Sequence, residues 1–380
     1  MNFDLSDEQV LLREAARDAF GRVRTVEAAR AALEGGELPD LWTTARQAGW
    51  TGLLVDEEHG GAALSAIDAI LVLVEAGRVL ASVPLLGHLP ATAILAASDS
   101  GVDGETLRKL AAGEWRAAYV PARPGDDVDP AWTAEPRSGR RRAPAPAAVR
   151  GDEGLATVSG TVAWVPDAVG ADVLVAVATN GDRPVAVAFL PGAEGVRVEA
   201  ASGVYDATRP LGHVTFENAT GHVLAAGEGE LRRAWFLAHA LVAAESLGAV
   251  EECLERSVAY AKERYTFGRP IGSYQAIKHA LTEVLRRQEN TRSLLYYAGW
   301  AYDDKPEEFA AAASAARAAG GAAFDFAARE LISVHGGIGA TWEHDAPLYF
   351  RRAQLSRRLL GGTSDAVDRL AGEMLSGAAA

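Results

Sequence analysis

The sequence predicts an α+β fold that is mostly helical, with a small β segment between two helical segments. Apolar residues recur at helical spacing through residues 1–113 and 225–380. Short valine-rich runs bounded by Gly, Pro, Asp or Asn fill residues 114–224. A chain of 380 residues also exceeds what one compact core usually organises. We therefore expect an N-terminal helical domain, a small antiparallel β-barrel or sandwich, and a C-terminal four-helix-type bundle.

Composition limits the classes of partner. The formal charge of −14 argues against non-specific binding to nucleic acid or to an anionic membrane surface. Cys253 is the single cysteine, so no disulfide can form within the chain, and we expect it to be a small buried hydrophobe. The N-terminus has no apolar signal segment, and no apolar run reaches the roughly 18 residues of a membrane span. The expectation is a cytoplasmic protein.

The N-terminal helices follow from caps and periodicity. Ser6, followed by Asp7 and Glu8, is typical of a helix start. Apolar faces and glycine stops predict further helices at Trp42–Gly49, Ser65–Leu80, Leu86–Ala97 and Gly104–Ala112.

Six short runs in the middle segment predict strands: Ala117–Val120, Ala156–Val165, Val173–Ala178, Pro184–Leu190, Val196–Glu199 and His213–Phe216. Within this segment, Pro136–Arg150 is rich in arginine, proline and alanine, so we expect a mobile loop. The alternative is that its arginines contact an anionic ligand tail.

The C-terminal segment begins at about Glu228 with a long helix whose apolar stripe contains Glu245. A carboxylate in such a stripe is costly to ionise unless it is paired. Glu245 therefore has two interpretations, an ion pair with an arginine of a neighbouring helix or a place in an active site. Further helices are expected at Tyr274–Asp303 and Pro306–Val334.

A firm break separates the first two of these helices. Its sequence is Phe-Gly-Arg-Pro-Ile-Gly at residues 267–272, where glycine and proline end a helix. Arg264, Arg269 and Lys278 surround the break, and Ser273 is placed to cap the next helix, leaving amide hydrogens for an anion. The alternative is a helix hairpin with solvated cations.

A second turn, His-Gly-Gly-Ile-Gly at residues 335–339, ends the helix that begins at Pro306. No strand precedes it, so it is not a dinucleotide fingerprint; it either terminates the helix or approaches a ligand closely. The sequence contains no metal-binding CxxC or HExxH pattern and no GxSxG elbow.

Several of these segments occur in the order typical of one family. They are Asp7-Glu8-Gln9, Gly49-Trp50-Thr51-Gly52-Leu53, Glu57-Glu58-His59-Gly60-Gly61, Arg264-Tyr265-Thr266-Phe267-Gly268-Arg269-Pro270-Ile271, Gln275 and His335-Gly336-Gly337-Ile338-Gly339. Over nearly its whole length the chain resembles the acyl-CoA dehydrogenases.

The resemblance implies an FAD that lies extended between two subunits. It assigns the pyrophosphate and adenosine half of that FAD to a set of residues in this chain, with the flavin ring mainly in the neighbouring subunit. The set is Arg264, Thr266, Phe267, Gln275, Gly336 and Gly337. The implied reaction removes a proton α to a thioester and transfers a hydride from the β carbon to flavin.

The chain departs from the family pattern in two places. Gly361 stands where the family usually has its catalytic glutamate, and the alternative position for the base, near Ala238 and His239, has no glutamate either. In the β segment, Arg123–Asp127 and the arginine- and proline-rich stretch replace a segment that supports flavin and substrate.

These departures lead to the hypothesis of a non-catalytic subunit in a heteromeric acyl-CoA dehydrogenase. The resemblance is to the paired actinobacterial subunits that act on steroid side-chain CoA thioesters, with an α2β2 assembly and an electron-transfer flavoprotein as candidate electron acceptor. One alternative is a self-sufficient homomeric enzyme that uses Glu245 as its base. The other is a structural or regulatory relative without flavin.

Overall fold

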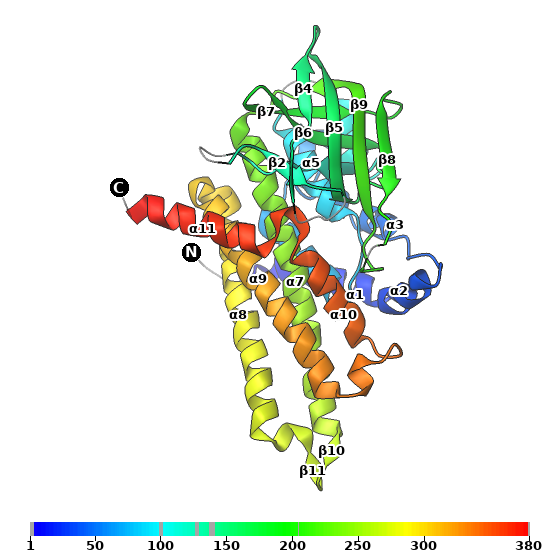
Figure 1. Ribbon diagram of the computed structural model, residues 1–380, viewed down its shortest axis with the longest axis vertical. Helices are drawn as coiled ribbons and strands as arrows, with labels where there is room; N and C mark the ends of the chain where they lie inside the picture. The colour runs from blue at the N-terminus through cyan, green and yellow to red at the C-terminus, as the bar shows by residue number, and fades with distance from the viewer. Residues whose placement is uncertain (1–3, 99–101, 126–128, 137–140, 204, 379–380) are drawn as a thin grey trace.

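The computed structural model describes residues 4–98, 102–125, 129–136, 141–203 and 205–378. Helices precede and follow a central group of strands, which confirms the predicted fold class. In Figure 1 the strands form one end of the molecule, and three long helices run from them to the opposite end.

The N-terminal part is helical. Its elements are α1 (Asp7–Gly21), α2 (Thr25–Leu33), α3 (Trp42–Gln47), η1 (Trp50–Gly52), η2 (Glu57–His59), α4 (Ala66–Arg78), α5 (Leu85–Ala96) and α6 (Gly104–Ala111). Ser6 caps α1 as predicted, since its hydroxyl accepts the Gln9 amide hydrogen at 3.2 Å and the Gln9 side chain accepts that of Ser6 at 3.1 Å.

Most of the central strands belong to one sheet that closes into a barrel, and two others form a separate two-stranded sheet. The central strands are β1 (Ala117–Val120), β2 (Trp132–Ala134), β3 (Arg142–Pro144), β4 (Ala147–Arg150), β5 (Leu155–Pro166), β6 (Val173–Asn180), β7 (Arg183–Phe189), β8 (Val196–Ala200) and β9 (Leu211–Val223). The path β6-β4-β5-β9-β7 closes because β7 also pairs with β6. Most pairings are antiparallel, as predicted, but β1 and β4 each pair with β6 in parallel.

The prediction of a mobile loop at Pro136–Arg150 is wrong for its second half. There β3 pairs with β2, and β4 pairs with β5. The Arg142 guanidinium lies 4.7 Å from the Trp132 ring and 2.6 Å from the carboxylate of Asp129. These contacts are between residues distant in sequence, so composition could not indicate them. Residues 137–140 lie outside the described part of the chain.

The C-terminal part contains α7 (Glu228–Glu263), β10 (Tyr265–Thr266), β11 (Arg269–Pro270), η3 (Ile271–Ser273), α8 (Gln275–Asp304), α9 (Pro306–His335), η4 (Ile338–Ala340), α10 (Ala346–Ser356), η5 (Leu359–Gly361) and α11 (Gly362–Ala378). Helices α7, α8 and α9 form the long bundle of Figure 1. Within the described residues, no helix combines the length and the apolarity needed to span a membrane.

Two glycines let α4 and α7 cross at very short distance. A Cβ atom at Gly77 would lie 2.0 Å from the Glu245 carbonyl oxygen, and one at Gly248 would lie 1.8 Å from the Val74 carbonyl oxygen. Nearly every residue of α4 is buried, and most of them are apolar. The N-terminal helices and the C-terminal bundle therefore share one core, which includes residues of both α4 and α7.

The break between α7 and α8 is a small β-hairpin at the far end of the bundle (Figure 1). Phe267 and Gly268 have φ of 46° and 77°, as a two-residue hairpin turn requires. The prediction that Ser273 caps α8 is wrong. Its hydroxyl donates to the Pro270 carbonyl at 2.7 Å, and Tyr274 is the N-cap residue.

Candidate functional site

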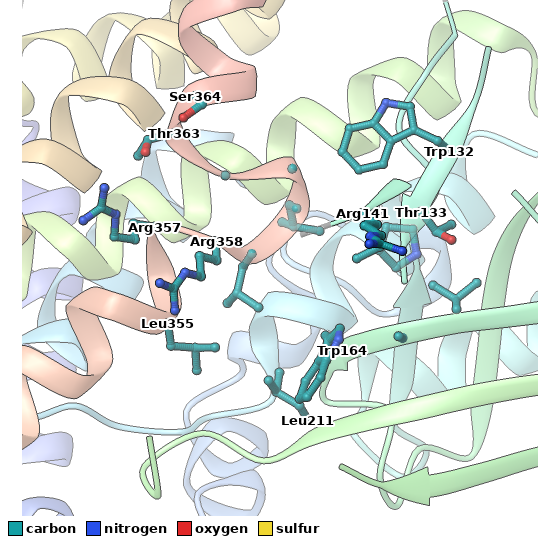
Figure 2. Close-up of a pocket in the computed structure, with 18 of the residues that line it drawn as sticks. Trp132, Thr133, Arg141, Trp164, Leu211, Leu355, Arg357, Arg358, Thr363 and Ser364 are labelled. Atoms are coloured by element: carbon teal, nitrogen blue, oxygen red, sulfur yellow. The ribbon is translucent and has the colours of Figure 1, made fainter. Parts of the chain in front are cut away.

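A cavity of about 520 Å³ lies between the barrel and the turn that joins α10 to α11. In Figure 2, Trp132, Thr133, Arg141 and Trp164 lie on the barrel side, opposite the segment from Leu355 to Ser364. The described lining residues are Pro121, Trp132, Thr133, Ala134, Arg141, Val162, Ala163, Trp164, Gly203, Tyr205, Leu211, Trp235, Leu355 and Arg357–Ser364. This volume is in the usual range for a small-molecule site.

The cavity wall suits a flat ring. Trp132, Trp164 and Trp235 contribute indole rings to the lining. The ring N–H of Trp132 bonds to Asp129 and that of Trp164 to the Glu135 carbonyl, at 3.2 and 3.3 Å. With these polar atoms occupied, the indoles offer apolar ring surface to a ligand.

One polar group in this wall has no hydrogen-bond partner among the residues that the structure describes. Thr133 is 4% exposed, and its hydroxyl makes no hydrogen bond to any described residue. Buried hydroxyls are normally bonded, so a ligand atom in the cavity could satisfy it. The residues present therefore fit a flat heteroaromatic group, although several differ from the flavin-supporting segment that the resemblance implied.

The described lining residues include no carboxylate. At Gly361 the backbone has φ of +81°, and a Cβ atom would lie 2.9 Å from a carboxylate oxygen of Asp365. Asp365 is itself buried and forms an ion pair with Arg123 at 2.8 Å. Burial raises the pKa of Asp365, and the Arg123 charge opposes that rise. Asp126 and Asp127 lie outside the described residues.

Glu245 lies away from this cavity, in a buried charge network. Its carboxylate pairs with Arg209, in the loop before β9, and lies 4.0 Å from Arg352 of α10. Arg352 also pairs with Asp206 at 2.6 Å. This geometry favours the ion-pair interpretation of Glu245. Its nearest partner comes from a loop and not, as predicted, from a neighbouring helix.

The residues expected to hold the adenosine half of FAD gather at the opposite end of the bundle. Arg264, Phe267, Gln275, Gly336 and Gly337 are exposed, and Thr266 is half-buried. The rings of Tyr260 and His335 stack at 4.2 Å, so the hairpin after α7 and the glycine turn after α9 are held side by side.

The two groups of residues are far apart within one chain. Trp235 lines the cavity, and α7 continues from it to Glu263, just before the hairpin. At 1.5 Å per residue this stretch spans about 42 Å. An extended dinucleotide is shorter than that, so the hairpin and the cavity of one chain cannot hold the two ends of the same molecule.

The residues that shape the cavity could not be found from the sequence. The three lining tryptophans come from β2, β5 and α7, and no shared spacing connects them. Arg317 and His239 bond to backbone carbonyls of the α10–α11 turn, and no sequence pattern indicated these contacts. A buried arginine within an alanine-rich helix was the only hint available.

The chain thus has helical segments on either side of a barrel and a cavity lined by tryptophans between the barrel and the α10–α11 turn. Residues 6–114 match the acyl-CoA dehydrogenase N-terminal domain, and residues 237–374 match the C-terminal domain. The chain belongs to the acyl-CoA dehydrogenase family, and it is an FAD-dependent oxidoreductase.

Named relatives agree with this assignment. Acyl-CoA dehydrogenase IpdE2 of Mycobacterium tuberculosis is 32% identical, over 97% of this chain and 98% of its own length. IpdE2 of Mycolicibacterium smegmatis is 30% identical, over 97% of this chain and 100% of its own length. Among solved structures, a variant of the Tcur3481-Tcur3483 steroid ACAD has a TM-score of 0.85 and 28% identity, covering 98% of this chain and 99% of that one.

Proposed function

We propose that this chain is the non-catalytic subunit of a heteromeric acyl-CoA dehydrogenase. A homologous catalytic subunit would complete an α2β2 complex, and the residues at the far end of this chain's bundle would complete that partner's FAD site. The substrate would be an acyl-CoA thioester, and a steroid side-chain CoA is the leading candidate. An electron-transfer flavoprotein would accept the electrons.

The observation that carries this proposal is the absence of a base from the described lining of the cavity. Removal of a proton α to a thioester requires a carboxylate or an equivalent base within reach of the α carbon. The described wall supplies arginine, tryptophan and hydroxyl side chains but no such group. The described part of the cavity lining therefore supplies no proton acceptor of the kind that the reaction needs.

The residues at the end of the bundle support the second half of the proposal. Arg264 can pair with a diphosphate, and the Thr266 hydroxyl can bond to it. Gln275 is the first residue of α8, where the helix N-terminus favours an anion. Phe267 is 95% exposed at the hairpin tip, as expected for a side chain that another subunit covers.

Bound FAD would accept the hydride from the β carbon, as its chemistry allows. This chain's part would be to bind and orient the adenosine half through Arg264, Thr266 and Gln275. Because these residues are about 42 Å from the cavity along α7, the FAD they serve would have its ring in another subunit.

The relatives give independent support for a heteromeric assembly. The solved steroid ACAD is named for two components, Tcur3481 and Tcur3483. That name also supports a steroid-derived acyl group for this chain's complex.

Co-expression with an adjacent homologous gene product tests the proposal. We expect a stable complex that contains FAD and oxidises an acyl-CoA, while this chain alone is inactive. If the chain alone purified with one FAD per subunit and oxidised an acyl-CoA, the proposal would be refuted.

An Arg264→Ala variant tests the cofactor contact. Loss of a charge-assisted bond to the diphosphate should weaken FAD binding by the complex about tenfold or more. Arg183→Ala, an exposed arginine in β7, serves as the matched control and should leave FAD binding unchanged. Equal FAD affinity in both variants would remove Arg264 from the cofactor site.

Glu245→Gln separates this proposal from the self-sufficient alternative. If Glu245 only balances Arg209 and Arg352, the variant should assemble poorly, because a buried charge loses its partner. A folded, FAD-containing variant that lost only exchange of the substrate α proton would support Glu245 as the base. A complex without flavin absorption would support the structural relative.

A further inference from the structure

The turn between α10 and α11 forms one wall of the cavity and has an unusual backbone. Leu360 has φ of 53° and ψ of 49°, a left-handed conformation that leucine rarely adopts. Gly361 and Gly362 follow with φ of 81° and 80°. A turn of this kind persists only where surrounding groups hold it.

Arg317 of α9 supplies the first of these groups. Its side chain is fully buried, and its Nη2 atom donates to the carbonyls of Ser356 and, at 3.1 Å, Leu359. These carbonyls lie at and just beyond the C-terminal end of α10, where helix carbonyls lack partners and the helix dipole is negative. Arg317 thus caps α10 from a different helix.

No carboxylate among the described residues forms an ion pair with Arg317, and its Nε and Nη1 atoms have no hydrogen-bond partner there. Burial lowers the pKa of Arg317 to about 10, so the side chain stays cationic at neutral pH. A buried cation balanced only by backbone carbonyls is costly.

His239 of α7 supplies the second group. Its Nε2 atom lies 2.9 Å from the Leu360 carbonyl oxygen. Burial lowers the pKa of His239 to about 3, so the ring is neutral and must carry its proton on Nε2 to donate to that carbonyl. The His239 ring also lies 5.1 Å from that of Trp235, which lines the cavity.

Gly321 shapes the other side of the turn. A Cβ atom there would lie 2.1 Å from Cγ2 of Thr363 and 3.3 Å from Nη1 of Arg317. The start of α11 therefore rests directly on the α9 backbone, one helical turn beyond Arg317.

We infer that Arg317 and His239 are positioning residues that hold the Leu359–Thr363 turn in its ligand-binding shape. Neither is among the described lining residues of the cavity, and both would act through the backbone carbonyls of its wall. The identity of that ligand as a flavin rests on the family's FAD dependence, whereas the positioning role rests on the geometry alone.

Hydrogen exchange on the full-length chain, in the assembly in which it purifies, tests the inference. Arg317→Met should raise amide exchange of Leu359–Ser364 about tenfold, the equivalent of one lost hydrogen bond, while that of β6 stays unchanged. Amide exchange of this turn in Arg317→Lys should fall between that of wild type and that of Arg317→Met, because an ammonium keeps the charge without the guanidinium fork. Unchanged exchange in the turn, or an equal rise in β6, would refute the role.

A matched pair at His239 keeps the test decisive even if Arg317→Met does not fold. Glutamine can donate to the Leu360 carbonyl, whereas leucine of similar size cannot. His239→Leu should therefore show about tenfold faster exchange in the turn than His239→Gln. Equal exchange in the two variants would overturn the inference.

The effect of the turn on ligand affinity is measured with FAD as the probe. FAD is titrated into flavin-free protein, and quenching of its tryptophan fluorescence, to which the three cavity tryptophans contribute, reports binding. His239→Leu should bind FAD more weakly than His239→Gln by about tenfold, and equal affinity would contradict a role in ligand binding. If FAD does not quench these tryptophans even in the wild-type chain, the ligand is not a flavin, and the exchange result alone decides the positioning role.

Discussion

Asp167 carries a testable pH dependence of stability. It directly follows the barrel strand β5, is 7% exposed, and accepts the Gly87 amide hydrogen at 2.7 Å. Burial raises its pKa to about 6, against the opposing charge of Arg209. The charge of Glu245 adds to this rise, and the charge of Arg116 adds to the opposition. The balance of these nearby charges therefore sets how far burial can raise the pKa of Asp167.

The sign and magnitude of this pH dependence follow from the difference between the pKa of Asp167 in the folded state and in the unfolded state. The folded-state pKa of about 6 exceeds the ordinary value of 3.8, so the folded state binds the proton more tightly than the unfolded state. Asp167 therefore lowers the free energy of unfolding as pH rises, until the full cost of about 3 kcal/mol is reached above pH 6. Between about pH 5 and pH 7.5 the loss due to this group is about 1.4 kcal/mol.

Asp167→Asn removes the titrating proton while keeping an oxygen that can accept the Gly87 hydrogen. We expect the variant to lack this loss, so its stability relative to wild type should rise by about 1.4 kcal/mol between pH 5 and pH 7.5. Urea denaturation of both proteins at the two pH values gives the difference.

Asp182→Asn, in the exposed turn between β6 and β7, is the control and should follow wild type at both pH values. Parallel curves for wild type and Asp167→Asn would show that Asp167 does not titrate in this range, and the charge-balance argument would fail.

Two further predictions concern glycines. Gly361→Glu should not create a catalytic base, because the new side chain would meet Asp365 and the positive φ of this position disfavours any side chain. We expect the variant to lose about 1–3 kcal/mol of stability and to show no gain in α-proton exchange of an acyl-CoA. Faster α-proton exchange would contradict this prediction. Gly248→Ala should cost about 3 kcal/mol or more, because its Cβ would lie 1.8 Å from the Val74 carbonyl oxygen. Gly229→Ala, near the start of α7 with no atom within 4 Å of its Cβ, is the matched control and should unfold at the wild-type temperature or above; equal melting of the two alanine variants would refute the close-crossing argument.

The order of elements could be predicted from sequence because it depends on local patterns. Apolar spacing of 3.6 residues indicated the helices, and valine-rich runs indicated β1, β5, β6, β7 and β8 close to their observed bounds. Ser6 was identified as a cap because a capping box lies within four residues of sequence. Such features need no knowledge of distant contacts.

Prediction failed where partners are far apart in sequence. Strand β4 has little β pattern of its own, and it forms because β5 and β6 offer open edges. Serine is a residue type typical of helix caps, yet the hairpin geometry directs the Ser273 hydroxyl to the Pro270 carbonyl. For Glu245, the sequence indicated a buried carboxylate but could not choose between an ion pair with a helix arginine and an active site, and the partner is Arg209 of a loop.

By itself, the sequence determined the helix–barrel–helix succession, the family resemblance and the loss of a glutamate at Gly361. Only the tertiary structure showed that the cavity is retained, and that its turn is held by His239 and Arg317. The physical reason is that a cavity is the space left between elements that pack together. Its wall therefore depends on distances between residues that no local pattern encodes.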